Sequence, residues 1–163
     1  MALPGFRIAQ SLTGTHPHIG AYAPAASQTF VRGDVVRWLQ ANTIKIAADD
    51  DAAALGVALD DAVDSAGTLR TEVRIAEFTG GTIFSADNSG TTLALGTHAG
   101  DTCSLDTTAM SVVVGTAGAA MFKIVGQDIT DNDTAGTGYR VLVTVPAAKS
   151  QASGYGTAAL DAT

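Results

Sequence analysis

Residues Thr71–Ala86 read TEVRIAEFTGGTIFSA, and this stretch decides the fold class. In its first half, Val73 and Ile75 alternate with charged neighbours, which is the period of a half-buried β-strand. The glycine pair at 80–81 interrupts the pattern, and such pairs mark turns. The second half, Thr82–Ala86, is again rich in β-branched and aromatic residues. The stretch therefore predicts two short strands with a glycine turn between them.

Similar short segments continue in both directions along the chain. They are bounded by Gly, Asn and Asp and follow one another at a spacing of roughly 8–12 residues. The predicted strands are Thr29–Leu39, Thr43–Ala47, Gly56–Leu59, Thr91–Gly96, Asp101–Leu105, Met110–Gly115, Met121–Gln127 and Gly138–Val145. Only the alanine-rich segment Asp49–Asp64 is a candidate helix. We therefore predict a mainly all-β fold, a small β-barrel or β-sandwich-like body of short strands with at most one short helix.

The two ends of the chain lack this strand pattern. Residues 1–28 contain three of the four prolines, several glycines and scattered apolar side chains without a period. Apolar side chains are uncommon in free disordered segments, so they predict an extended N-terminal arm that docks onto a surface. Residues 147–163 form a C-terminal tail of similar type. The predicted organisation is an arm at 1–28, a β-rich body at 29–146 and a tail at 147–163.

The composition argues against several classes of protein. Of the 163 residues, 46% are apolar, which argues against disorder throughout, and 15% are charged, against about 25% in ordinary soluble domains. The formal net charge is -7, so we expect no binding to nucleic acid through its phosphates. No apolar run has the length of a membrane span, and the N-terminus lacks the apolar core of a secretory signal. We therefore expect synthesis in a cytoplasm and no membrane partner.

The histidines and acidic runs do not predict a metal site. His16 and His18 flank a proline, but no acidic or cysteine ligand lies near them in sequence. The runs at Asp49–Asp51 and Asp60–Asp64 have the composition of turns. The segment at 128–133 is similar to a calcium loop but lacks the glycine and the closing glutamate of an EF-hand. Adventitious calcium binding remains an open alternative for this segment.

The sequence also predicts no enzyme. Ser104 and Ser111 have no histidine in a suggestive position, and no nucleophile-elbow motif is present. The glycine pair at 80–81 has no lysine at the spacing of a phosphate loop. Cys103 is the single cysteine, which excludes an internal disulfide and favours a small buried strand residue. We therefore assign no catalytic, cofactor-binding or metal-ligating residue.

The order of segments in the body is similar to that of a known family. Between Phe30 and Asp61 the chain reads FVRGDVVRWL and then TIKIAADDDAAALGVALDD. The matching residues are Gly33, Asp34, Val35, Asp51, Ala52, Leu55, Gly56, Val57 and Ala58, followed by Gly81–Phe84, Val125-Gly126 and Tyr139–Val143. Over about 30–146 the chain resembles the head decoration, or cement, proteins of tailed bacteriophages.

This resemblance implies a structural virion protein without cofactor or catalysis. Such a protein binds the outer surface of an HK97-like capsid, clamps neighbouring major-capsid subunits and stabilises the expanded head. The implied partners are the major capsid protein and further copies of the chain, with a homo-oligomer that is favoured to be a trimer and could be a dimer. The implied location is the outer capsid surface of the virion. Another phage or bacterial structural β-module, such as a tail, fibre or surface-adhesion domain that binds a protein or glycan, remains the alternative.

An arm that orders on binding covers a wide surface per residue and can add strands to a neighbour's sheet edge. We therefore predict Phe6, Ile8 and Tyr22 as the partner-binding anchors of the arm. Trp38 is expected in the core instead, because large aromatic side chains dominate the packing of cores.

Overall fold

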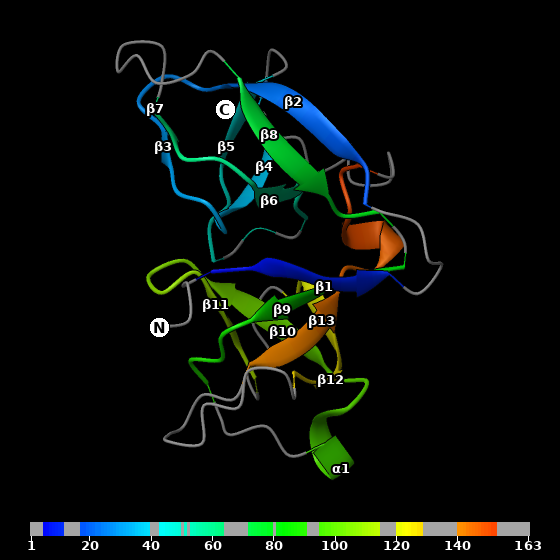
Figure 1. The fold of residues 1–163 in the computed structure, drawn as a ribbon. Helices are drawn as coiled ribbons and strands as arrows, with labels where there is room; N and C mark the ends of the chain where they lie inside the picture. The colour runs from blue at the N-terminus through cyan, green and yellow to red at the C-terminus, as the bar shows by residue number, and fades with distance from the viewer. Residues whose placement is uncertain are drawn as a thin grey trace.

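The structure, a computed structural model, consists mainly of β-strands (Figure 1). It describes residues 5–11, 17–39, 43–49, 51, 53–63, 72–79, 81–90, 95–114, 120–128 and 140–152. The strands are β1 (Arg7–Ser11), β2 (Ile19–Pro24), β3 (Thr29–Phe30), β4 (Val35–Leu39), β5 (Thr43–Ile46), β6 (Gly56–Ala58), β7 (Ala62–Val63), β8 (Val73–Glu77), β9 (Thr82–Ala86), β10 (Thr102–Asp106), β11 (Ser111–Val113), β12 (Phe122–Gln127) and β13 (Val141–Thr144). A short helix α1 (Leu95–His98) and a 3₁₀ turn (Ala147–Lys149) complete the described elements. The predicted all-β fold is confirmed.

Five strands close into a barrel in the order β2-β5-β4-β6-β8, which forms the upper layer in Figure 1. Neighbouring strands are antiparallel except β2 and β5, which run parallel and pair at Ala23–Thr43 and Pro24–Ile44. One core cluster lies in this layer and consists of Phe30, Val36, Ile44, Leu55, Ala58, Ala62, Val73 and Ile75. Closure leaves the barrel strands without a free edge.

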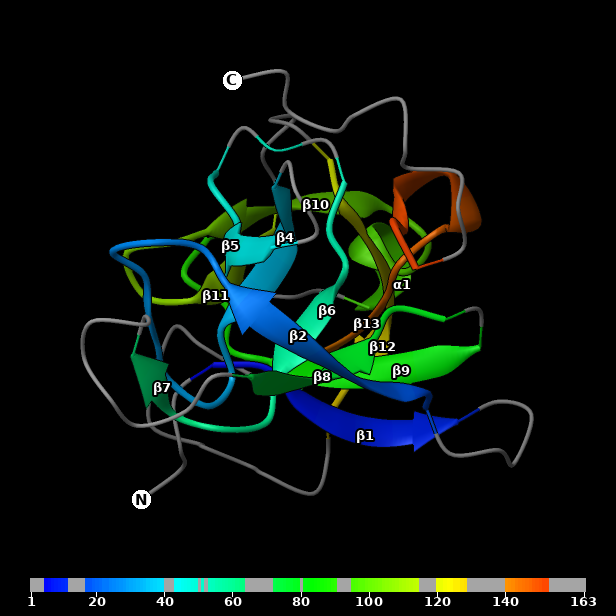
Figure 2. The same cartoon turned by 90° about the horizontal axis from the view of Figure 1, so that it is seen from above.

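The second layer is a six-stranded antiparallel sheet in the order β1-β9-β13-β12-β10-β11. Its β11 edge is covered by the segment that follows β9. The Val112 N–H donates to the carbonyl of Asp87 (2.8 Å), and the Ser89 N–H donates to the carbonyl of Val112 (2.9 Å). The opposite edge, β1, lies next to the barrel (Figures 1 and 2). There the Phe6 N–H donates to the carbonyl of Gly33 (3.0 Å), which ties this edge to the turn before β4.

Gly33 and Asp34, the first residues of the Gly33-Asp34-Val35 motif that resembles head decoration proteins, form that turn. Gly33 has a φ of 101°, a conformation that favours glycine. The Asp34 carboxylate accepts the Val31 N–H (2.8 Å), and the Asp34 N–H donates to the Val31 carbonyl (3.0 Å). The Gly33 N–H donates to the carbonyl of Ala58 (2.9 Å). Turn geometry therefore accounts for both residues of the motif.

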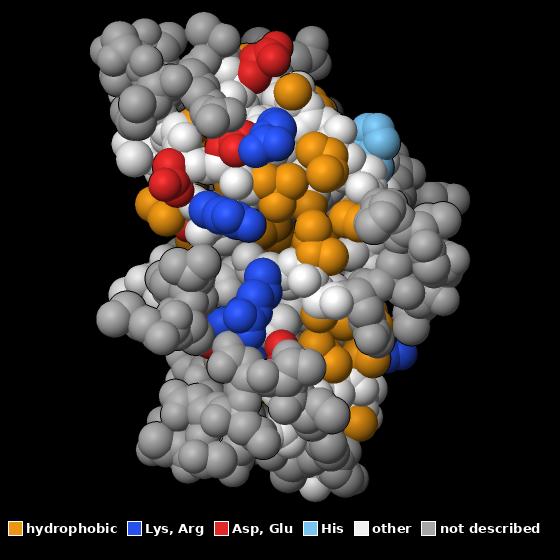
Figure 3. Space-filling model, in the orientation of Figure 1, with side chains coloured by type: hydrophobic (Ala, Val, Ile, Leu, Met, Phe, Trp, Pro, Cys, Tyr) orange, Lys and Arg blue, Asp and Glu red, His pale blue; other side chains and the backbone are white. Residues whose placement is uncertain are grey.

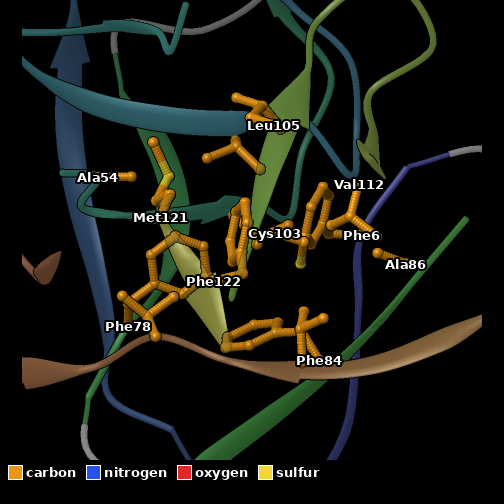
Figure 4. Close-up of a cluster of buried hydrophobic side chains, with 14 of the residues drawn as sticks. Phe6, Ala54, Phe78, Phe84, Ala86, Cys103, Leu105, Val112, Met121 and Phe122 are labelled. Atoms are coloured by element: carbon orange, nitrogen blue, oxygen red, sulfur yellow. The ribbon is translucent and has the colours of Figure 1, made fainter. Parts of the chain in front are cut away.

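The larger hydrophobic core lies between the two layers (Figure 4). Val35, Val57 and Ala76 enter it from the barrel, and Phe84 and Phe122 enter it from the sheet. Side chains from both layers point toward one another in this cluster (Figure 4). Since one core serves both layers, we expect barrel and sheet to unfold together.

The prediction of residues 1–28 as a separate arm is corrected for its described part. β1 pairs with β9 inside the sheet, and β2 pairs with β5 and β8 inside the barrel. Phe6 is 3% exposed, and its ring centroid lies 5.0 Å from that of Phe122. Of the apolar residues of this segment, Phe6 therefore packs in the chain's own core, whereas Ile8 and Ile19 are exposed on paired strands. Residues 1–4 and 12–16 of the predicted arm lie outside the described residues.

The first residues of the predicted tail also belong to the body. The Ala54 N–H donates to the carbonyl of Lys149 (3.0 Å), and the Gln151 N–H donates to the carbonyl of Ala54 (2.9 Å). Gln151 further accepts the Trp38 N–H at its side-chain oxygen (2.7 Å). Trp38 packs against the barrel core, in agreement with its predicted core position. The rest of the predicted tail, 153–163, lies outside the described residues.

Two local predictions differ from the structure. The second half of the candidate helix Asp49–Asp64 contains the strands β6 and β7, because pairing with neighbouring strands overrides the helix propensity of alanine. The predicted strand Thr91–Gly96 ends in α1, which begins at Leu95. Its first four residues lie outside the described residues.

Gly56 is a position where the barrel leaves no room for a side chain. A Cβ there would lie 2.2 Å from the carbonyl oxygen of Ala76 and 2.6 Å from Cγ2 of Ile75. Because the backbone cannot move away without breaking the pairing of β6 with β8, Gly56→Ala should lower the free energy of unfolding by about 3 kcal/mol. Gly126→Ala is the control, since no atom lies within 4 Å of its added Cβ, and it should change stability by less than about 0.5 kcal/mol. Urea unfolding measures both, and equal losses would contradict the prediction.

Candidate partner-binding surface

Strand β2 presents an apolar side to solvent. Side chains alternate along a strand, and in β2 every second residue is exposed. We name these residues the β2 strip: Ile19, Ala21 and Ala23. Ile19 is 52% exposed, and the strip carries neither a charge nor a hydrogen-bonding side chain. In Figure 3 hydrophobic side chains gather over β2 and β8 on this face.

An ion pair whose charges cancel lies along one side of the β2 strip. Arg74 on β8 lies directly opposite Ala21 in the register of the two strands. The Arg74 guanidinium donates from Nε to Oδ2 of Asp60 (2.8 Å) and from a terminal nitrogen to Oδ1 (2.6 Å). This bidentate contact to Asp60, and then the charge of that carboxylate, raise the pKa of Arg74. The strip is therefore bordered by a polar pair that adds no net charge.

The inward side of β2 contains an aromatic pair and a carboxylate. The ring of Tyr22 meets that of Trp38 edge-on at 4.9 Å between centroids. The Tyr22 hydroxyl donates to Oε1 of Glu77, the last residue of β8. Burial, then the hydrogen bond to Glu77 and its charge, raise the pKa of Tyr22 far above its usual range. Tyr22 therefore remains a neutral donor to this carboxylate.

His18 contacts the same carboxylate from outside. Its Nδ1 lies 2.9 Å from Oε1 of Glu77, and its carbonyl accepts the Glu77 N–H at 2.9 Å. The imidazole is 69% exposed, whereas the Glu77 side chain is 9% exposed. His18 thus stands at the first end of the β2 strip, next to Ile19, and is held by a buried acid.

The structure separates the three predicted anchor residues. Phe6 lies in the core between the layers and is not a surface group in this structure. Ile8 is 38% exposed on β1, in the other layer. Tyr22 is half-buried and bound to Glu77. Their sequence proximity therefore does not produce a single surface, and their contact with a partner stays a prediction.

Three further residues considered for chemistry, Cys103, Asp51 and Asp49, are buried or bonded within the fold. Burial raises the pKa of the Cys103 thiol to about 12, so it is a poor nucleophile. Asp51 pairs with Arg37 and accepts the Ala48 N–H. Asp49 accepts the Thr107 N–H. These carboxylates thus join segments of the fold.

The acidic segment that was similar to a calcium loop is described only at its start. Asp128 accepts the Ser85 hydroxyl (2.5 Å), and residues 131–133 lie outside the described residues. His16, Asp50 and Asp64 also lie outside them. Within the described ranges, no group of three or more acidic, histidine or cysteine side chains could hold a metal ion. No helix in the same ranges has the length and apolarity needed to cross a membrane.

Comparison with known proteins does not assign a family. No protein-family model, no curated protein and no solved structure matches the chain.

Sequence patterns alone did not reveal the β2 strip or the role of Glu77, although part of the strand signal of β2 was present. Residues 19–24 read IGAYAP, in which Ile19, Ala21 and Ala23 alternate with Gly20, Tyr22 and Pro24. Alanine and glycine give a weak strand signal, which hides this period. The contact of His18 with Glu77 had no local signal, because pairing of β2 with β8 creates it.

Proposed function

We propose that this chain is a structural virion protein that binds the outer surface of an HK97-like phage capsid. It clamps neighbouring major-capsid subunits and stabilises the expanded head, as a homo-oligomer in which a trimer is favoured and a dimer is the second possibility. The resemblance of residues 30–146 to head decoration proteins supports this proposal. An all-β body is compatible with it.

The exposed β2 strip is the observation that carries the proposal. Its side chains are small and uncharged, so a flat protein surface can approach the strand without desolvating charged groups. Ile19 is the largest side chain of the strip and would be its anchor. An oligomer that engages several capsid subunits gains avidity even if each contact is modest.

A binding experiment with point variants tests this proposal. Empty expanded shells that lack the protein are mixed with purified chain, and binding is measured by co-sedimentation. We expect saturable binding, and Ile19→Asp should weaken it at least about tenfold, because a carboxylate is placed in an apolar contact. The experiment uses point substitutions and not a deletion of residues 1–28, because that deletion would remove a barrel strand.

The control is Val125→Asp, which introduces the same charge at an exposed apolar residue of β12 in the other layer. Its binding should equal that of the unmodified chain. Absence of binding to every shell would reject the proposed function and favour a tail, fibre or adhesion module. Equal losses for both variants would reject the β2 strip as the contact surface.

A further inference from the structure

The buried carboxylate of Glu77 orients the exposed imidazole of His18. Glu77 is almost fully buried, and a buried carboxylate is costly unless hydrogen bonds compensate it. Its Oε1 receives the Tyr22 hydroxyl from inside the barrel and His18 Nδ1 from outside. The Tyr22 hydroxyl alone would satisfy one lone pair of the Glu77 carboxylate. The second contact, between Glu77 and His18 Nδ1, fixes the position of the imidazole.

Gly20 makes this arrangement possible. A Cβ at this position would lie 2.5 Å from the Tyr22 ring and hydroxyl and 2.6 Å from Oε1 of Glu77. The glycine therefore lets the hydroxyl and the carboxylate meet over β2. The cluster of His18, Tyr22 and Glu77 depends on local backbone space as well as on strand pairing.

The contact with Glu77 sets the hydrogen-bonding character of His18. A carboxylate accepts hydrogen bonds, so Nδ1 carries the proton that points to Glu77. In the neutral imidazole the other nitrogen, Nε2, is then an acceptor. This acceptor belongs to an exposed side chain beside Ile19, at the end of the β2 strip.

We propose that Nε2 of His18 is the polar recognition point of the β2 strip and accepts a hydrogen bond from an N–H or O–H group of the partner protein. This inference rests on the proposed function, because it names the chemistry that the capsid surface presents next to Ile19. The apolar strip supplies contact area, and one oriented acceptor fixes the register of the partner. Glu77 is a positioning residue in this arrangement, and Tyr22 holds Glu77 in place.

The test compares shell binding of the unmodified chain, His18→Ala and His98→Ala at pH 7.5. His98 is the control because it lies in α1, at the opposite end of the molecule from β2 in Figure 1. At pH 7.5, His18→Ala should bind about tenfold more weakly than the other two proteins.

Several outcomes would overturn the inference while leaving the proposed function intact. Normal binding of His18→Ala at pH 7.5 removes His18 from the interface. A ¹⁵N NMR measurement on the free protein is independent of shells, and protonation of Nε2 instead of Nδ1 in the neutral imidazole would also overturn the inference. If no shell binds, the proposed function fails, and the proposed role of His18 at that surface is rejected with it.

Discussion

Arg140→Met should lower the free energy of unfolding by about 3–5 kcal/mol, because it removes the donor group of a buried polar network. Arg140 is 2% exposed and precedes β13. Its guanidinium donates to the hydroxyl (2.8 Å) and carbonyl (2.9 Å) of Ser85, to the carbonyl of Gly5 (3.0 Å) and to Asp87 (2.7 Å). Methionine keeps an unbranched apolar stem but supplies no donor.

The cost arises from the groups that remain buried. The Ser85 hydroxyl also donates to Asp128, and the Asp128 N–H donates to the carbonyl of Arg140 (3.0 Å). Without the guanidinium, the buried acceptors lose a partner and the Asp87 carboxylate loses its ion pair with Arg140. The Gly5 carbonyl would also lose its hydrogen bond from the guanidinium. Urea unfolding followed by circular dichroism measures the loss.

Arg7→Met is the control for this prediction. Arg7 also approaches Asp128, but at 3.8 Å, and its side chain is 42% exposed. An exposed pair at this distance contributes little, so the control should lose less than about 1 kcal/mol. Equal losses for Arg7→Met and Arg140→Met would show that the buried network does not provide the stability assigned to it.

Much of the fold could be predicted from local sequence patterns. The alternation around Val73 and Ile75 predicted β8, and the β-branched run at Thr82–Ala86 predicted β9. The apolar stretches ending at Gln127 and Val145 predicted β12 and β13. In each case the pattern was a period of two residues or a short β-branched run between turns. Tertiary contacts did not override this local preference.

The N-terminal strands could not be predicted in the same way. Phe6 and Ile8 are separated by the spacing of a strand. Their own segment offers no other apolar partner at that spacing. Their place depends on pairing with β9, which lies far along the chain. Likewise, β2 contains glycine, alanine and proline, and it becomes a strand because β8 and β5 pair with it. Propensity is a weak guide for strands that are defined by their neighbours.

The candidate site was hidden for a related reason. Glu77 follows Val73 and Ile75 at a spacing of two residues, so it falls on the same face of the strand. In the folded chain its inward direction places the carboxylate between Tyr22 and His18. A polar residue that breaks an apolar face near a strand end is thus a signal of a buried polar contact, although its partners appear only after folding.

Phe122→Ala should lower the free energy of unfolding by about 3–5 kcal/mol and weaken both layers together. Phe122 is fully buried on β12, and its ring lies 5.0 Å from that of Phe6 and 6.0 Å from that of Phe78. Phe78 directly follows the barrel strand β8, so this ring cluster joins the barrel, the sheet and the N-terminal segment (Figure 4). Removing the central ring leaves a cavity that neighbours from two layers cannot fill without moving the layers.

Cooperativity distinguishes this shared core from two independent ones. Since Val35 and Ala76 of the barrel lie in the same cluster as Phe122, thermal unfolding of the unmodified chain and of Phe122→Ala should each show one transition. The control Val125→Ala lies on the same strand, 42% exposed, and should change stability by less than about 0.5 kcal/mol. If Phe122→Ala instead produced two transitions, with the barrel melting at its original temperature, the layers would be separate folding units. In that case, docking of a partner at β2 could not stabilise the sheet through the core. A single transition, in contrast, means that the stabilisation gained when a partner binds the β2 strip extends to both layers.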